Sequence, residues 1–158
     1  MSGLEFKRDG LKCFRFLLIC FSLFFTVNNH VSGGEIEVRS GVSVGDRLGL
    51  HVGAYYDIPL SGIFSIQTGA LLHTTNDADR ASIGVNAPVY ASFHLPVSQS
   101  AKVRLNCGAF VGASKGFDAG FTADAGVEWK RFYTGINYFH DFTEYGTFHS
   151  GISFGYRF

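Results

Sequence analysis

Several features that mark other protein classes are scarce in this 158-residue sequence. It contains three cysteines and three prolines, and thirteen basic residues balance thirteen acidic residues. A chain without net charge has no overall field to attract nucleic acid or an anionic surface, so nucleic acid is not an expected partner. Cys13 and Cys20 lie near the N-terminus, which leaves Cys107 without a cysteine partner in the remaining chain. No internal disulfide is expected there.

The sequence also lacks the motifs that usually indicate catalytic or cofactor chemistry. Its six histidines are scattered, without the close spacing that is typical of metal sites. No glycine-rich loop leads into a helical pattern, so the 20 glycines do not indicate a phosphate site. We therefore expect no metal, no cofactor and no enzymatic activity.

No hydrophobic run is long enough for a membrane-spanning helix, but a shorter one lies near the N-terminus. Basic residues precede an apolar run of about twelve residues, Phe16 to Val27, and the polar residues 28–30 are followed by the small or aliphatic residues 31–34. This order is typical of a signal peptide, which we assign to residues 1–33. A retained anchor is the alternative, but a spanning helix needs roughly 20 apolar residues. A lipoprotein is disfavoured because Leu18 and Ile19, not a small residue, precede Cys20.

Glycine and aromatic residues are abundant, and the apolar pattern beyond Glu35 has a period of two. In the last segment one face carries Phe148, Ser150, Ile152, Phe154, Tyr156 and Phe158. The intervening positions are small or polar, as expected of a strand with two different faces. The same alternation occurs in segments 36–44, 48–57, 64–70, 82–95, 102–109, 117–128 and 132–138, which brings the number of strands to eight. Short, polar, turn-prone segments separate them.

The second face of each strand distinguishes a membrane barrel from a soluble one. It is rich in glycine, serine and asparagine and carries few charges, which suits the crowded lumen of a small barrel. The candidate lumen charges are Glu37, Arg39, Lys102, Arg104, Asp118, Asp124, Glu128 and Arg157. Pairing between these acids and bases would fill the interior, so we expect no open pore. The prediction is an all-β, eight-stranded antiparallel up-and-down transmembrane β-barrel over residues 34–158.

Two further features concern the strands of this barrel. Pro88 lies inside a predicted strand, where it removes a ladder donor, so we expect a bulge or a break in the ladder. Tyr56, Trp129 and Phe158 all fall at one predicted rim, where such rings would form an aromatic girdle in a membrane. In a soluble barrel the same rings would be core or edge aromatics.

The stretch from Val38 to Phe158 resembles the PorT-like outer-membrane β-barrel proteins. The resemblance rests on residues 40–43, 53–60, 86–90, 107–112 and 155–158, and it is one of pattern more than of a rigid motif. It implies a place in the cell outer membrane of a Gram-negative bacterium, among outer-membrane lipids and lipopolysaccharide. Phe154, Tyr156 and Phe158 then resemble the C-terminal signal that the barrel-assembly machinery reads. Because residues 86–87 and the short loops depart from the family pattern, a specialised role in secretion is not transferred.

The expected function is a structural or protein-interaction role in the outer membrane, with an unidentified protein partner. Two alternatives remain open. A soluble lipocalin-like barrel would need an apolar lumen and a polar exterior. A lipid A-modifying enzyme would need an activated serine within reach of a histidine, which draws attention to His140, Glu144, His149 and Ser150. His149 and Ser150 are adjacent on one strand, so they should point to opposite faces.

Overall fold

The computed structural model describes residues 33–45, 48–76, 81–114, 116–143 and 148–158, without the side chains of residues 75, 76, 81, 82 and 148. The predicted signal peptide, apart from Gly33, lies outside the described residues. Among the described residues, no helix is long and apolar enough to cross a membrane.

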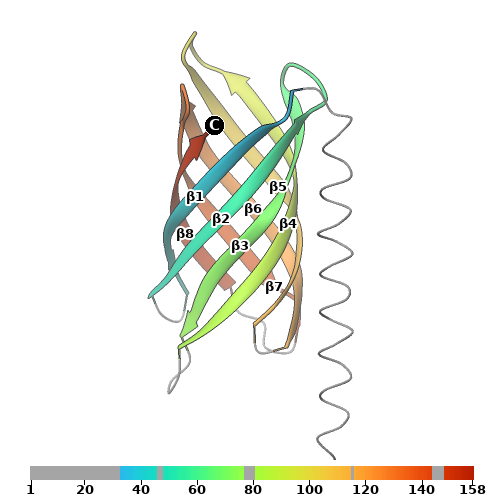
Figure 1. Cartoon of the computed structure of the whole chain (residues 1–158), viewed down its shortest axis with the longest axis vertical. Coiled ribbons are helices and arrows are strands. Elements are labelled where there is room, and N and C mark those ends of the chain that lie inside the picture. Colours follow the sequence, from blue (N-terminus) through green and yellow to red (C-terminus); the bar gives the residue numbers. More distant parts are fainter. Residues whose placement is uncertain (1–32, 46–47, 77–80, 115, 144–147) are drawn as a thin grey trace, which may run out of the picture. The chain divides into compact units, whose positions relative to one another are not determined.

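Eight antiparallel strands form one closed barrel, in which each strand pairs with its neighbours in sequence (Figure 1). Pairing between β1 and β8 closes the sheet, from Glu37 opposite Arg157 to Val44 opposite Ser150. The predicted all-β, eight-stranded antiparallel up-and-down barrel is confirmed. The strands are β1 (Glu35–Val44), β2 (Leu48–Pro59), β3 (Phe64–Asn76), β4 (Ala81–Pro96), β5 (Ala101–Ala113), β6 (Phe117–Trp129), β7 (Phe132–Asp141) and β8 (Phe148–Arg157).

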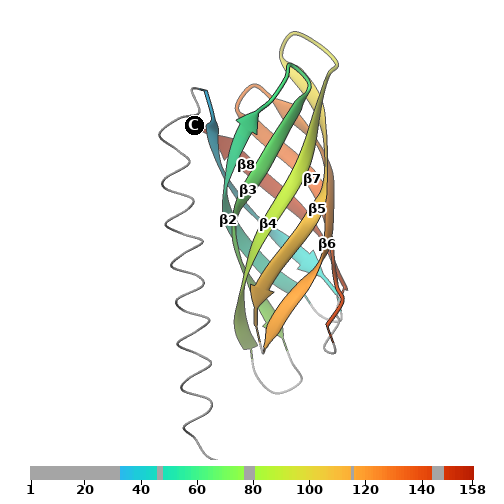
Figure 2. The same ribbon diagram turned by 90° about the vertical axis from the view of Figure 1, so that its right-hand side faces the viewer.

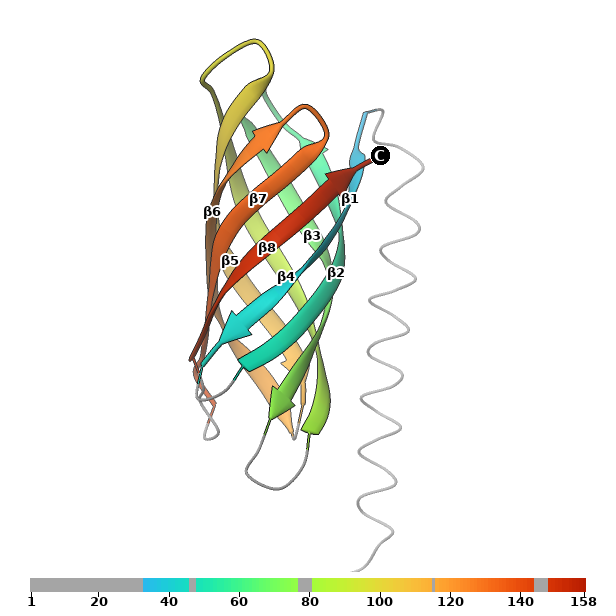
Figure 3. The same cartoon turned by 90° about the vertical axis from the view of Figure 1, so that its left-hand side faces the viewer.

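The period-two pattern of the sequence determines which side chains enter the lumen. Along β2, exposed and buried residues alternate from Leu48 to Asp57, with leucine and valine outside and histidine, tyrosine and aspartate inside. Successive side chains of a strand point to opposite faces, so the same two-sided pattern continues around the tilted sheet seen in Figures 2 and 3. Aliphatic residues therefore lie mainly outside, and the lumen face is mainly polar or aromatic.

The connections divide between two ends of the barrel. The end that carries Gly33 and Phe158 also carries the connections 60–63, 97–100 and 130–131, and we call it the terminal end (Figure 3). The opposite end, which we call the loop end, carries the connections that follow β1, β3, β5 and β7. Tyr56, Trp129 and Phe158 lie at the terminal end, as the sequence predicts.

Several strands extend further than the sequence pattern predicts. The sequence pattern ends the second strand at residue 57, but this strand continues to Pro59, which pairs with Ser65. Pro96, Trp129 and Asp141 also lie within strands. Turn-forming residue types therefore mark the general location of each turn, whereas backbone pairing determines where the strand ends.

Pro88 causes a break in the ladder without a bulge. The register between β3 and β4 is the same on both sides of the gap, from Thr68 opposite Val89 to Leu71 opposite Asn86. Pairing of Pro88 with β5 continues. The Thr68 hydroxyl donates to the Pro88 carbonyl at 3.2 Å, so the backbone polar groups of Pro88 face β3. This is the side on which proline lacks its N–H donor.

Candidate functional site

The lumen holds two regions, an apolar cluster and a charged network. Tyr55, Leu71, Tyr90, Phe110 and Phe139 form the apolar cluster and are all buried. The rings of Phe110 and Phe139 meet edge to face, with centroids 5.5 Å apart. Such edge contacts are favourable because the positive edge of one ring meets the negative face of the other. This cluster closes part of the interior with bulky side chains.

Arg39 of β1 is the first centre of the charged network. Its guanidinium donates to Glu37, to Asp124 Oδ2 at 2.9 Å and to Gln67. It also lies over the rings of Tyr55 and Tyr133, 4.3 Å and 4.5 Å from their centroids. A planar guanidinium can donate in its plane and stack on both of its faces, which an ammonium cannot do.

Arg104 of β5 is the second centre, and its side chain is fully buried. Its guanidinium donates to both oxygens of Glu37 at 2.7 Å and 3.0 Å, and to Glu128 Oε1 at 2.7 Å. It also lies 3.8 Å from the centroid of the Tyr133 ring. Removing a charge from water costs several kcal/mol, and only close pairing of this kind offsets that cost. The two arginines and their acids therefore form one interdependent unit.

Six of the eight candidate lumen charges belong to this network. Arg157 joins it from β8 through Glu128 and Glu37, and it also pairs with Glu35 at 2.9 Å. Asp118 is buried, but no ion pair connects it to the network within the described residues. Lys102 is exposed and likewise has no ion pair in the described part of the chain.

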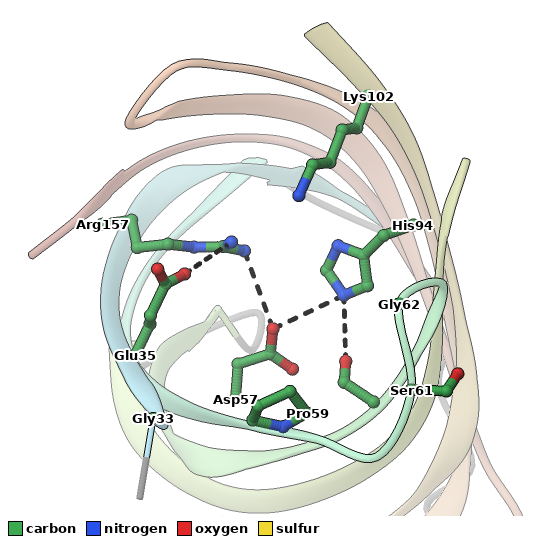
Figure 4. A pocket seen from close by; sticks show the side chains of 10 residues that line it. Gly33, Glu35, Asp57, Pro59, Ser61, Gly62, His94, Lys102 and Arg157 are labelled. Carbon is green, nitrogen blue, oxygen red and sulfur yellow. Dashed lines mark hydrogen bonds and ion pairs between the residues drawn. The ribbon is translucent and has the colours of Figure 1, made fainter. Parts of the chain in front are cut away.

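A small pocket of about 200 Å³ opens beside the network at the terminal end (Figure 4). Its lining comes from most of the barrel wall and from the β2–β3 turn. The lining residues are Gly33, Glu35, Asp57, Pro59, Ser61, Gly62, Ser65, His94, Lys102 and Arg157. The mouth of the lumen is therefore polar and contains charges of both signs.

Two pocket residues, Ser65 and His94, form with Glu128 a group that has the composition of a catalytic triad. His94 Nε2 lies 2.9 Å from Ser65 Oγ, and His94 Nδ1 lies 3.3 Å from Glu128 Oε2. However, Asp57 Oδ2 also lies 3.4 Å from the same Nε2. The imidazole thus has a carboxylate beside each of its two nitrogens, whereas a catalytic triad has one at Nδ1 only and keeps Nε2 for the serine. The arrangement therefore suits a structural hydrogen-bond network better than nucleophilic catalysis.

Alternation separates the histidines and the serine that the sequence analysis considered for lipid A chemistry. His149 faces the lumen and Ser150 faces outward, as alternation predicts. His140 and Ser150 share the outward face, but the described residues show no hydrogen bond between them, and His140 stacks on Tyr138 instead. Glu144 lies outside the described residues.

The remaining lumen histidines lie toward the loop end. His51 Nε2 lies 2.9 Å from Ser153 Oγ, and the rings of His73 and His149 are 6.2 Å apart. Within the described ranges, no three histidine, cysteine or acidic side chains are arranged to hold a metal ion.

Sequence reasoning did not identify the residues that complete the network. Tyr55, Tyr133 and Gln67 contact Arg39, and Asp57 and His94 line the pocket. Alternation places all five on the lumen face, but it does not indicate which of them meet across the barrel. Only the stagger of the closed sheet brings residues of β1, β3 and β6 to the same level.

Comparisons with known proteins find similarity to solved structures but no match by sequence. No family model matches the sequence, and no curated protein matches it. The outer membrane enzyme PagL has a TM-score of 0.60 at 12% identity, covering 78% of this chain and 97% of PagL. The N-terminal β-barrel domain of Pseudomonas aeruginosa OprF has a TM-score of 0.53 at 12% identity, with the same two coverages. Ail, the attachment invasion locus protein of Yersinia pestis, has a TM-score of 0.51 at 13% identity, covering 79% of this chain and 97% of Ail. The chain thus has the fold of small eight-stranded outer-membrane β-barrels.

Proposed function

We propose that this protein is a small integral barrel of the outer membrane, with a structural or protein-interaction role and without an open pore. The observation that supports this most strongly is the distribution of polarity. Twenty-nine large hydrophobic side chains among the described residues are exposed, whereas Arg39, Arg104 and their acidic partners are buried in the lumen. Soluble monomers rarely expose apolar patches beyond a few hundred Å². Lipid contact would remove the cost of this surface.

The soluble lipocalin-like alternative requires the reverse distribution, with an apolar lumen and a polar exterior. The resemblance to PorT-like proteins supports the outer-membrane proposal, as does the fold shared with Ail, OprF and PagL. In this proposal residues 1–33 direct export and Phe154, Tyr156 and Phe158 provide the signal for the barrel-assembly machinery. Phe154 and Phe158 are exposed on the outward face, where such a signal would be accessible.

The proposed orientation places the terminal end in the periplasm. Short turns are typical of the periplasmic end of such barrels, and the longest connection, residues 142–147, lies at the loop end. Trp129 and Phe158 would then sit in the periplasmic aromatic girdle, and the loop end would meet lipopolysaccharide in the outer leaflet.

Cell fractionation with heat-modifiable gel migration tests the location. We expect the protein in the outer-membrane fraction, with faster migration in unheated samples because the closed barrel resists denaturation by detergent. Recovery as a soluble periplasmic protein would contradict the proposal.

Electrical recording tests the absence of a pore. The charged network and the apolar cluster occupy the lumen, so we expect the purified protein in planar bilayers to produce no stepwise conductance. Regular conductance steps that scale with salt concentration would contradict this part of the proposal.

The lipid A-modifying enzyme remains a second candidate because PagL, an outer membrane enzyme, shares the fold. At 12% identity this likeness concerns the fold alone. We expect the mass spectrum of lipid A to be the same with and without the gene. A loss or gain of acyl chains on overexpression would favour the enzyme.

A further inference from the structure

Three histidines gather in the lumen toward the loop end. His51 of β2 and His73 of β3 lie directly opposite each other in the sheet, and the His73 ring is 6.2 Å from the ring of His149 of β8. Glycines on neighbouring strands make room for two of the rings. A Cβ on Gly41 would lie 2.6 Å from His51 Nε2, and a Cβ on Gly84 would lie 2.5 Å from His73 Nε2. His73 is close enough to both other histidines for their charges to repel.

The hydrogen bonds around His51 suit a neutral ring. Ser153 Oγ lies 2.9 Å from His51 Nε2, and the Asn137 amide donates to the same hydroxyl at 2.5 Å. The Asn137 nitrogen also lies 3.4 Å from His51 Nε2. Since Ser153 accepts a hydrogen from Asn137, its own hydrogen is directed to Nε2, which then acts as the acceptor. An imidazolium carries a hydrogen on both nitrogens, so a charged His51 would oppose these donors.

The surroundings of His73 also disfavour a charged ring. Its Nε2 is buried and has no hydrogen-bond partner within the described residues. Because the charged form has a hydrogen on this nitrogen, it would bury an N–H group without an acceptor. Such a group costs more than a satisfied one, particularly when it belongs to a charged side chain.

The charged groups near the three histidines provide little compensation for three positive charges. Asp118 of β6 is buried and close enough to attract a charge on His73. Arg39 of β1 instead repels a charge on His51. Asp141 lies on the lumen face at the end of β7 and is the second acid at this end among the described residues. Nearby lumen positions on β4, β5 and β8 are uncharged, namely Gly84, Asn86, Gly112, Gly151 and Ser153.

We propose that the loop end of the barrel is an acid-responsive switch, which opens locally when these three histidines become charged. Histidine is the side chain whose charge ordinarily changes between about pH 5 and 8. A histidine that the folded structure holds neutral lowers stability as the pH falls. One charge on His73 pairs with Asp118, whereas further charges on His51 and His149 meet repulsion. The strand ends of β2, β3 and β8 then separate, while the pairs of the charged network hold the rest of the barrel closed.

Amide hydrogen exchange of the full-length protein in detergent tests this inference, which does not depend on the proposed membrane location. Rates at pH 7.5 and pH 5.0 are each divided by the intrinsic rate at that pH, so that only protection is compared. We expect protection of residues 49–51, 71–73 and 149–151 to fall about tenfold or more at pH 5.0. Protection of residues 104–107, in the middle of β5, should change less than about twofold. Equal protection of the loop end at both pH values would overturn the proposal.

Variants distinguish the three histidines from other effects of acid. A triple variant with His51→Gln, His73→Gln and His149→Gln cannot gain these charges, so the difference between the two pH values should vanish. His140→Gln is the matched control and should keep the full difference, because His140 lies toward the same end on the outward face. Asp118→Asn should enlarge the difference, because it removes the attraction for a charged His73.

Heat-modifiable migration verifies that each variant folds. If the triple variant does not fold, His149→Gln alone decides, and it should reduce the difference at least threefold. A full difference in the folded triple variant, or in His149→Gln where that variant decides, would overturn the proposal. A loss of the difference in His140→Gln would overturn it as well, since the responsive histidine would then lie outside the lumen.

Discussion

At the scale of single residues, the lumen is organised around two arginines. Arg39 and Arg104 each contact acids from more than one strand and stack on Tyr133. The sequence identifies these charges as lumen residues because alternation gives their face. It does not predict their partners, since Glu37 meets Arg104 across 67 positions of the chain. The contact between Glu37 and Arg104 depends on the stagger of the strands in the closed sheet.

Arg104→Met tests the contribution of this pairing to stability. The change leaves Glu37 and Glu128 buried with fewer counter-charges, so we expect a loss of about 3–5 kcal/mol in the free energy of unfolding. Urea titration in detergent micelles, read by the fraction of heat-modifiable protein, measures it. Lys102→Met is the control, because loss of an exposed and unpaired charge should change stability by less than about 0.5 kcal/mol. Equal effects of the two changes would show that the network contributes little.

Ser65 provides a second test at this scale. Since Asp57 and Ser65 share His94 Nε2, we expect Ser65 to be unreactive toward a fluorophosphonate probe. Intact-protein mass spectrometry after incubation should show no adduct on the wild-type protein. An adduct that Ser65→Ala abolishes would mean that the Ser65, His94 and Glu128 group is a working nucleophilic site.

At the scale of strands, the sequence predicts the number of elements and the face of each residue more reliably than the ends of strands. Alternation fixes the phase because a one-residue slip would turn every apolar side chain of that strand into the lumen. The ends are less predictable, as Pro59 shows, because a turn-forming residue also pairs when the neighbouring strand presents a partner. The Pro88 gap was predictable because proline has no N–H, whereas the unchanged register was not.

Glycines at close strand approaches give a test of the packing between strands. A Cβ on Gly108 would lie 1.9 Å from the Val89 carbonyl oxygen and 2.9 Å from Tyr90 Cα. Both obstacles are backbone atoms, so a side-chain rotation cannot relieve the clash. We expect Gly108→Ala to lower the unfolding midpoint in urea clearly or to prevent folding. Gly62→Ala is the control because nothing lies within 4 Å of its added Cβ. If both variants have the wild-type midpoint, the strands are less tightly apposed there than described.

At the scale of the whole molecule, the distribution of polarity is the reverse of that in a soluble globular protein. Charged side chains are buried in the lumen, and large hydrophobic side chains are exposed on the outer wall. Ile136 is 64% exposed on the outer wall of β7, while Phe139 of the same strand is 8% exposed in the lumen. In a membrane the outer wall would contact acyl chains, and the backbone groups of the closed sheet would be satisfied by neighbouring strands. We propose that this outer wall is in contact with lipid.

Quenching of tryptophan fluorescence by brominated lipids tests this claim most directly. The sequence has one tryptophan, Trp129, so a Trp129→Phe background permits single tryptophans at other positions. After reconstitution into vesicles, a tryptophan introduced by Ile136→Trp should be strongly quenched by bromine on the acyl chains. A tryptophan introduced by Phe139→Trp should be much less quenched, because its ring lies in the lumen. Equal and weak quenching at both positions would show that the outer wall of β7 does not contact lipid.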